Sequence, residues 1–289
     1  MNNQIYLIDK PAGITSFDVV QKVRKSSGIR RVGHAGTLDP FATGLLIVAS
    51  GPFTRLVDFF HSYPKTYLAT FQLGVSTDTD DMTGAVKIEK DVSAVCQSDI
   101  LSSLEQFRGE ITQQPPSISA KRVEGKRLYH VNRESVKVEA RPVQVVVHEI
   151  RLIEVELPYV KLEIECGTGT YIRSIARDLG EKLEVGGAVK SLCRTAIGPF
   201  KLTDACDLEK PKPIPHLSIL PELESFSLGS EAINELSSGK SLVLRDVFLD
   251  EGQRIRIFDD YFRTMRVLCR VTMNGSVGCR IQPEKVFGI

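Results

Sequence analysis

One stretch near the amino terminus limits what this chain can fold into more than any other. Residues 33–40 read GHAGTLDP and lead directly into an apolar run at residues 45–49. Glycine permits backbone conformations closed to other residues, while proline fixes its own φ and favours an extended geometry for Asp39. We therefore predict a loop over residues 33–40 that displays the Asp39 carboxylate beside a buried strand. The competing interpretation is an ordinary turn in which Asp39 bonds its own backbone.

The composition indicates a globular protein with hydrophobic cores. The chain has 289 residues, of which 42% are hydrophobic, enough for a main domain and a smaller one. Its first residues lack the layout of a signal peptide, and no apolar run approaches the roughly 18 residues that span a bilayer. The six cysteines include no C-x-x-C pair, which argues against a structural zinc site or a disulfide framework. We expect a cytoplasmic protein with reduced cysteines, no bound metal and no membrane contact.

Charge is distributed unevenly along the chain. The net charge is only +1, yet residues 1–65 carry eight Lys or Arg against four acidic residues. Residues 120–133 are also basic, with an aromatic residue among the cations. Such patterns are typical of solvated surface and, as a second interpretation, of contact with RNA phosphates.

Hydrophobic periodicity predicts a chain of alternating strands and helices. We predict strands at residues 5–8, 45–49 and 66–73, three more at 143–147, 150–155 and 160–164, and an edge strand with a bulge at 194–200. Helices are expected at residues 16–27 with Ser16 as N-cap, 55–61, 98–107 and 175–183. After a proline-rich boundary at 211–216, a short helix at 230–238 and strands at 254–258, 265–271 and 277–281, with an Asn274-Gly275 turn, suggest a small β-barrel.

With these pieces placed, the chain resembles the bacterial tRNA pseudouridine-55 synthase family, which modifies the T-loop uridine. GHAGTLDPFATGLL is similar to the catalytic motif of that family over its whole length, and KPAGITS at residues 10–16 is similar to the signature before it. Three further segments match in order: KTY at 65–67, QPP at 114–116 with the residues up to Tyr129, and GTYIR at 169–173. The resemblance covers residues 5 to about 200.

The resemblance implies an α+β fold. It consists of a pseudouridine synthase core, with a mixed and largely antiparallel sheet flanked by helices, over residues 1–222, followed by a small PUA-like RNA-binding β-barrel over residues 223–289. The glycine-rich strand usual in that second domain is replaced here by residues 261–266, YFRTMR. This departure leaves the RNA contacts of the second domain open.

The implied reaction breaks the N1 to C1′ bond of uridine, rotates the uracil and joins C5 to C1′. It needs no cofactor, but it needs a nucleophile that is already anionic at neutral pH, and an aspartate qualifies. Asp39 matches the catalytic position, and the sequence leaves open whether it adds to the uracil ring or to C1′. Arg173 is the expected ion-pair partner that keeps Asp39 charged and oriented.

The implied substrate-binding residues follow from the same motifs. Tyr67 is expected to stack on the flipped uracil and, by resemblance, to serve as the proton-abstracting base. Tyr171 is expected to buttress the pocket and fix Arg173, and Leu192 to pack against the base. His34 corresponds to the residue that enters the space left by the flipped base. Lys10 is expected to support the catalytic loop.

The expected partner is tRNA, bound through its T-arm and, by the second domain, at its acceptor end. Arg30, Arg31, Lys121 and Lys126 are candidates for phosphate contacts. We expect a monomer that needs no protein partner. Two other functions compete with this interpretation: a tRNA-binding or folding module without catalysis, and a glycosidase, which would require a second carboxylate near Asp39.

Overall fold

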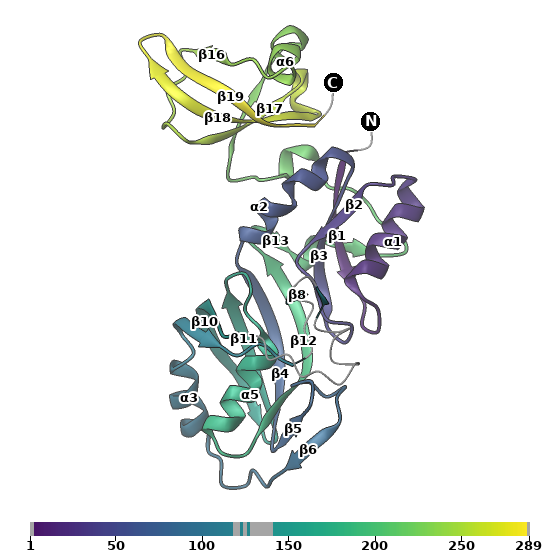
Figure 1. The fold of residues 1–289 in the computed structure, drawn as a ribbon, viewed down its shortest axis with the longest axis vertical. Coiled ribbons are helices and arrows are strands. Elements are labelled where there is room, and N and C mark those ends of the chain that lie inside the picture. Colours follow the sequence, from purple (N-terminus) through teal and green to yellow (C-terminus); the bar gives the residue numbers. More distant parts are fainter. Residues whose placement is uncertain (1–2, 118–121, 124–125, 128–140, 288–289) are drawn as a thin grey trace.

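A ten-stranded mixed sheet forms the body of the protein in the computed structural model, which describes residues 3–117, 122–123, 126–127 and 141–287 (Figure 1). Eight strands follow the order β14-β1-β3-β12-β4-β11-β10-β7, with β2 attached to β3 and β13 to β12. The pairs β1–β14 and β3–β12 are parallel and the others are antiparallel. The strand bounds are β1 (Gln4–Lys10), β2 (Val32–Ala35), β3 (Thr43–Ser50), β4 (Lys65–Leu73), β7 (Gly109–Gln113), β10 (Val143–Glu156), β11 (Tyr159–Cys166), β12 (Gly187–Ile197), β13 (Phe200–Lys201) and β14 (Cys206–Asp207).

Helices cover the sheet where its apolar side chains need shielding from water. Helix α1 packs Val19, Val20 and Val23 against β1 and β3, whereas α3 and α5 pack against the half of the sheet that holds β4 and β11. The helix bounds are α1 (Ser16–Ser27), α2 (Val57–Ser62), α3 (Gln97–Glu105), α5 (Ile172–Lys182) and α6 (Ser230–Ser237). Short 3-10 turns are η1 (Gly51–Leu56), η3 (Leu202–Asp204), η4 (His216–Ser218) and η5 (Asp260–Phe262). Two small ribbons lie apart from the large sheet: β5 (Val75–Thr77) with β6 (Val86–Glu89), and β8 (Arg122–Val123) with β9 (Lys126–Arg127).

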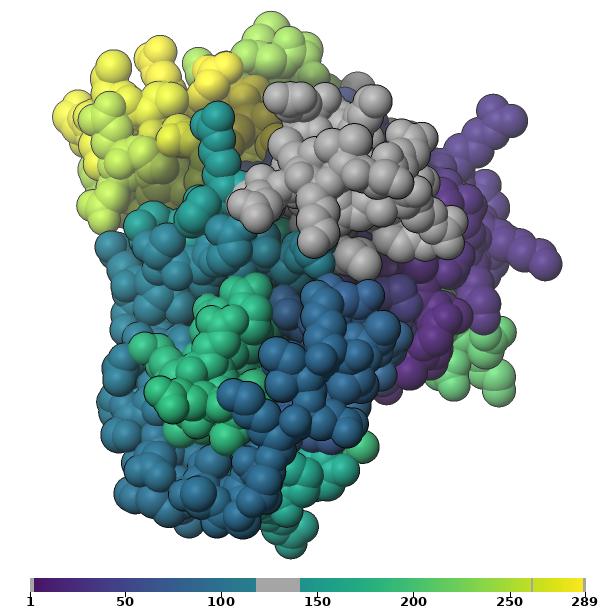
Figure 2. Space-filling model, turned by 60° about the horizontal axis from the view of Figure 1, so that its bottom comes forward, coloured from purple at the N-terminus to yellow at the C-terminus, as the bar shows by residue number. Residues whose placement is uncertain are grey.

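The carboxyl-terminal part forms a second, curled sheet of five strands. Its order is β15-β17-β18-β19-β16, with bounds β15 (Glu224–Ser227), β16 (Leu242–Arg245), β17 (Arg254–Phe258), β18 (Met265–Gly275) and β19 (Gly278–Val286). This sheet is consistent with a PUA-like domain, and the core agrees with the expected mixed sheet flanked by helices. One hydrophobic cluster, with Phe53 of η1 and Phe287 among its members, joins the two parts. In the space-filling view the yellow carboxyl-terminal part lies beside the main body (Figure 2).

Several local predictions need correction. The residue that caps α1 is Thr15, whose hydroxyl accepts a hydrogen bond from the backbone of Asp18, and not Ser16. The first two of the three β segments predicted at 143–164 are one continuous strand, β10. The hairpin between β18 and β19 turns at Ser276-Val277, because Gly275 pairs with Gly278, and not at Asn274-Gly275.

The most consequential correction concerns β12. An edge strand with a bulge is predicted at residues 194–200, but residues 194–197 belong to β12, which lies between β3 and β4 in the middle of the sheet. The predicted bulge is present, as register shifts in the pairing of β12 with β4. Because β12 is central, Arg194 is buried inside the protein instead of lying on its surface.

Candidate active site

A tight turn between β2 and β3 presents Asp39. The predicted loop is shorter than expected, since Val32–Ala35 form β2 and only the residues after it make the turn. The Lys10 amino group reaches across from the end of β1 and donates a 3.3 Å hydrogen bond to the Pro40 carbonyl. Ser16 accepts a 2.9 Å hydrogen bond from the Leu38 N–H. The turn is therefore anchored at both ends to β1 and α1, which fixes the direction of the carboxylate.

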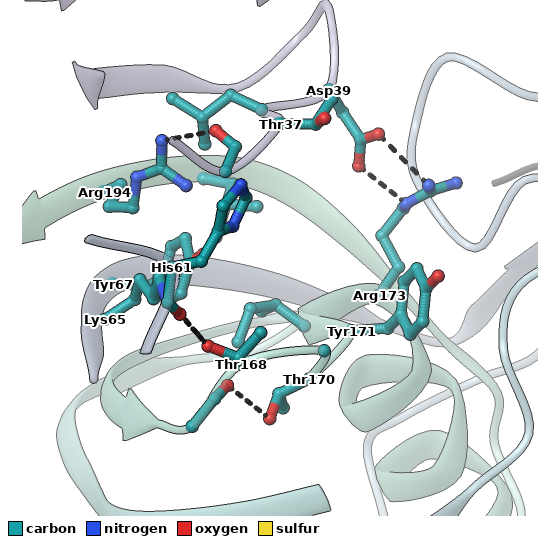
Figure 3. Close-up of a pocket in the computed structure, with 16 residues that line it drawn as sticks. Thr37, Asp39, His61, Lys65, Tyr67, Thr168, Thr170, Tyr171, Arg173 and Arg194 are labelled. Carbon is teal, nitrogen blue, oxygen red and sulfur yellow. Dashed lines mark hydrogen bonds and ion pairs between the residues drawn. The ribbon is translucent and has the colours of Figure 1, made fainter. Parts of the chain in front are cut away.

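Arg173 in the first turn of α5 forms a two-point ion pair with Asp39. Its Nε lies 2.9 Å from Oδ2, and its second terminal nitrogen donates to Oδ1 at 3.2 Å (Figure 3). The arginine side chain is 6% exposed and the aspartate side chain 34% exposed. A bidentate guanidinium holds a carboxylate in one plane as well as attracting it. Arg173 thus sets the orientation of the Asp39 carboxylate, and the side of the carboxylate away from Arg173 stays open.

A second carboxylate, Asp81, lies on the other side of Arg173. A terminal guanidinium nitrogen of Arg173 lies 3.5 Å from Oδ2 of Asp81. The same nitrogen donates a hydrogen bond to the Thr79 carbonyl at 2.9 Å. Asp81 is 5% exposed and is held by hydrogen bonds from Thr79 and Thr83. Because all these bonds fix it away from solvent, Asp81 orients Arg173 and is not placed as the free acid and base that a retaining glycosidase needs.

A half-open cavity of about 380 Å³ begins at Asp39. Tyr67 on β4, Leu192 on β12 and Tyr171 at the start of α5 contribute side chains to it, so the predicted binding residues converge (Figure 3). The full lining consists of Gly36, Thr37, Leu38, Asp39, His61, Lys65, Tyr67, Gly167, Thr168, Gly169, Thr170, Tyr171, Ile172, Arg173, Leu192 and Arg194. Aromatic and aliphatic walls with one carboxylate at the edge suit a flat, weakly polar ring.

The end of the cavity away from the Asp39 pair is rich in cations. The Lys65 amino group donates to the His61 carbonyl at 2.6 Å and to the Thr168 hydroxyl at 3.0 Å. Burial lowers the pKa of Lys65 to about 8, and nearby Arg194 adds to that shift. The cavity therefore has a carboxylate at one end and buried positive charge at the other (Figure 3).

Some predicted residues lie outside the cavity. His34 is on β2 and does not line it; its ring Nδ1 is buried without a partner in the described part of the chain, and burial lowers its pKa to about 4. Arg30 and Arg31 are exposed between α1 and β2. Lys121 lies outside the described residues, as does the side chain of Lys126 on β9.

The ionisation of Asp39 reflects two opposing effects. Burial raises the pKa of the carboxyl, whereas the ion pair with Arg173 lowers it, and burial is the larger effect. Arg173 therefore restrains this shift without cancelling it. The result is a carboxylate that is less solvated than one in water, which makes it a better nucleophile.

Sequence reasoning missed two of the side chains that complete this site. Arg194 was assigned to an edge strand, although alternation along the strand from Leu192 would have placed both on one face. Asp81, like Asp78 and Asp80, could not be placed from the sequence, because its position beside Arg173 depends on how the loop between β5 and β6 reaches α5. Within the described residues, no group of three or more His, Cys, Asp or Glu is arranged to hold a metal ion. No helix of the described part is long and apolar enough to cross a membrane.

Comparison with known proteins places this geometry in a family. The model of the TruB family pseudouridylate synthase, N terminal domain, matches residues 24–172. A tRNA pseudouridine synthase B of Dehalococcoides mccartyi is 40% identical over 296 residues, which cover 99% of this chain and 96% of that protein. The enzyme of the same name from Prochlorococcus marinus is 43% identical over 252 residues, covering 82% and 80% of the two chains.

Solved structures agree with the fold. A chain from the crystal structure of a Cbf5-Nop10-Gar1 complex superimposes with a TM-score of 0.70 at 25% identity, covering 99% of this chain and 85% of that one. A chain from an H/ACA RNP bound to a substrate RNA gives a TM-score of 0.72 at 22% identity. The carboxylate, arginine and tyrosine gathered around one cavity, together with these matches over nearly the whole sequence, lead to one conclusion. The chain belongs to the TruB family of pseudouridylate synthases and is an isomerase that converts uridine to pseudouridine.

Proposed function

We propose that this isomerase acts on the T-loop uridine of tRNA, position 55, with Asp39 as the nucleophile. The observation that supports this most is the two-point ion pair of Asp39 with Arg173 at the edge of a cavity lined by Tyr67 and Leu192. The relatives of the chain that carry the name tRNA pseudouridine synthase B support tRNA as the substrate. A non-catalytic tRNA-binding module would have no use for a half-buried carboxylate whose orientation is fixed.

The cavity suggests a role for each lining residue. The target uridine must leave its stack to reach Asp39, and stacking on Tyr67 would return about 1 to 3 kcal/mol of the cost. Leu192, which is 7% exposed, would pack against the uracil ring. Asp39 attacks either the ring or C1′, and both routes need the same open oxygen face. Tyr67 then accepts the proton lost from C5.

The surrounding residues support that assignment. The backbone of Tyr171 both donates to and accepts from the buried side chain of Gln113, at 2.9 and 3.2 Å, which fixes the start of α5 and with it Arg173. Lys10 holds the Asp39 turn. We propose that His34 enters the RNA when the base leaves, although it does not line the cavity in this structure.

The tRNA path and the state of the enzyme are also proposals. Arg30 and Arg31 are exposed and available for phosphates, and Lys121 and Lys126 are assigned the same role from the sequence. We place the domain boundary between residues 222 and 223, just before β15, with the second domain on the acceptor end of the tRNA. Since one chain supplies every side chain of the cavity, we propose a monomer without a protein partner. Six free cysteines suit the reducing cytoplasm.

The test is to map pseudouridine in an unmodified tRNA transcript. Wild-type protein should modify position 55 alone, whereas Asp39→Asn should bind the tRNA and leave it unmodified. The matched control is Asp204→Asn, which removes an exposed carboxylate from η3 and should keep full activity. A transcript with cytidine at position 55 should stay unmodified.

Each part of the proposal can fail separately. Pseudouridine formed by Asp39→Asn would remove the nucleophile assignment, and modification elsewhere would remove the substrate assignment while leaving the reaction class intact. Release of free uracil would indicate hydrolysis of the glycosidic bond in place of isomerisation.

A further inference from the structure

Arg194 is a buried cation that the mechanism above does not use. It is 1% exposed and lies at the point where β12 meets both of its neighbours, opposite Gly44 of β3 and opposite Tyr67 of β4. Directly opposed residues on adjacent strands project to the same face of a sheet. Arg194 and Tyr67 therefore share one face, and both line the cavity (Figure 3).

The contacts of Arg194 leave its charge without a matching anion. Its Nε donates to the Leu45 carbonyl at 2.8 Å, and a terminal nitrogen donates to the Gly36 carbonyl at 3.1 Å. In the part of the chain that the structure describes, no carboxylate forms an ion pair with it. Burying a charge without a counterion costs free energy, and a nearby group that becomes negative would offset that cost.

The group that can use this charge is the Tyr67 oxygen. Tyr67 is buried at the same level of the sheet, and burial makes its pKa higher, whereas the Arg194 guanidinium acts in the opposite direction. Lys65 also lies in the cavity, but its amino group is turned to the His61 and Tyr63 carbonyls and to Thr168. Arg194 is thus the cation that faces Tyr67 across the strand pair.

We propose that Arg194 is a positioning residue for the isomerisation, which orients the Tyr67 oxygen and offsets the negative charge of the Tyr67 phenolate before that phenolate accepts the C5 proton. This inference rests on the proposed role of Tyr67 as the base. In that step the C5–H bond breaks and the proton passes to the Tyr67 phenolate oxygen, while the C5–H electron pair forms the C5=C6 double bond. At the same time C6 gives up one bond: the second bond of C6=N1, whose pair goes to N1, or, if Asp39 has added to the ring, the bond to the Asp39 carboxylate. One proton leaves C5 and one is taken up by N1, so the reaction stays an isomerisation.

The test measures loss of the C5 hydrogen directly. A tRNA transcript carrying tritium at C5 of its uridines is mixed with excess enzyme, and the tritium released to water is followed from pH 6 to 9.5. Arg194→Gln should slow release at pH 7 at least about tenfold. In a plot of release rate against pH, the ascending limb should move to higher pH by about 1 to 3 units. Arg194→Lys keeps the charge and should leave the limb where it is in the wild type.

A double variant separates this role from a structural one. In a Tyr67→Phe background, Arg194→Gln should cause no further slowing, because the group it acts through is gone. Arg256→Gln is the matched control, since Arg256 is also buried and bound to backbone carbonyls, those of Leu217, Ile219 and Leu223, far from the cavity. It should lower the free energy of unfolding without moving the pH limb.

The outcomes distinguish the two proposals. If Tyr67→Phe releases tritium at the wild-type rate, Tyr67 is not the base. Its proposed role and that of Arg194 then both fall, while Asp39 as the nucleophile is unaffected. If Tyr67→Phe slows tritium release, only the role of Arg194 is overturned by either of two results. One is that Arg194→Gln keeps the pH dependence of the wild type; the other is that it slows the residual release of Tyr67→Phe by the same factor as that of the wild type. If Arg194→Gln fails to fold, the proposed role of Arg194 is instead overturned by an Arg194→Lys protein whose ascending limb differs from that of the wild type.

Discussion

The ionisable residues of the site carry the chemistry, and burial makes the environment of Asp39 unfavourable to its charged form. Burial raises its pKa above the ordinary value of 3.8, and Arg173 only partly opposes this. A carboxyl with a raised native pKa favours folding while it is protonated. That contribution is present below the unfolded pKa and is lost as the pH rises through the native pKa.

This sign gives a test at the level of one residue. We expect the free energy of unfolding of the wild type, minus that of Asp39→Asn, to fall as the pH rises from about 4 and to level off above the native pKa of Asp39. Urea unfolding followed by circular dichroism measures both proteins at each pH. A difference that instead grows with pH would mean that the Arg173 ion pair outweighs burial.

The exposed arginines before β2 lead to a second prediction. If Arg30 or Arg31 contacts a tRNA phosphate, its replacement by alanine should weaken binding of every tRNA equally and reduce the slope of log affinity against log salt by about 1. The same alanine replacement at Arg263, which is exposed in the second domain, is the comparison variant for Arg30→Ala and Arg31→Ala. An unchanged salt slope in both Arg30→Ala and Arg31→Ala would remove these residues from the tRNA path.

Among the secondary-structure elements, the sequence predicted where helices and strands lie in the chain better than which strands are adjacent in the sheet. The strand at β3 and the helix α1 with its stop at Gly28 follow from periodicity and turn residues, and both are present. The position of β12 in the sheet could not be predicted, because composition alone does not separate an edge strand with an exposed arginine from a central strand that buries one. Asp39 and Arg173 were found through motif resemblance, whereas Asp81 depends on contacts between segments distant in sequence.

The central position of β12 explains a glycine in the signature stretch. Gly44 has φ of +100°, and a Cβ there would lie 2.4 Å from the Arg194 carbonyl oxygen. We expect Gly44→Ala to lower the free energy of unfolding by at least about 2 kcal/mol, because backbone strain adds to a clash with backbone. Gly33→Ala, eleven residues earlier on β2, meets nothing within 4 Å and should change stability by no more than about 0.5 kcal/mol.

Unfolding in urea compares the two alanine variants with the wild type. Gly44→Ala should also reduce pseudouridine formation, since the displaced backbone belongs to Arg194. Equal stability of the two variants would contradict the close approach of β3 and β12 at this point.

At the scale of the whole molecule, His216 joins the two sheets. Its Nδ1 accepts a 3.2 Å hydrogen bond from the Met265 N–H of β18, so its Nε2 carries the proton that is donated to the Asn3 carbonyl at 3.0 Å. The ring also packs edge-on against Phe53, with centroids 4.9 Å apart. Burial disfavours the charged ring and lowers the pKa of His216. A second proton on Nδ1 would also displace the hydrogen bond from the Met265 N–H.

A histidine with a lowered native pKa stabilises the fold above its unfolded pKa of about 6.5, and this contribution is lost as the pH falls. At pH 7.5, His216→Gln should cost about 1 kcal/mol for each hydrogen bond it fails to restore. The difference in the free energy of unfolding between the wild type and His216→Gln should narrow as the pH falls from 7 to 5, because only the wild type must exclude a proton from this position. His34 and His61 also have lowered pKa values, but they are present in both proteins and cancel in the difference. Urea unfolding at each pH, with hydrogen exchange of the Met265 amide as a local probe, measures the effect. Parallel stability curves for the two proteins would show that protonation of His216 does not loosen the joint between the core and the carboxyl-terminal sheet.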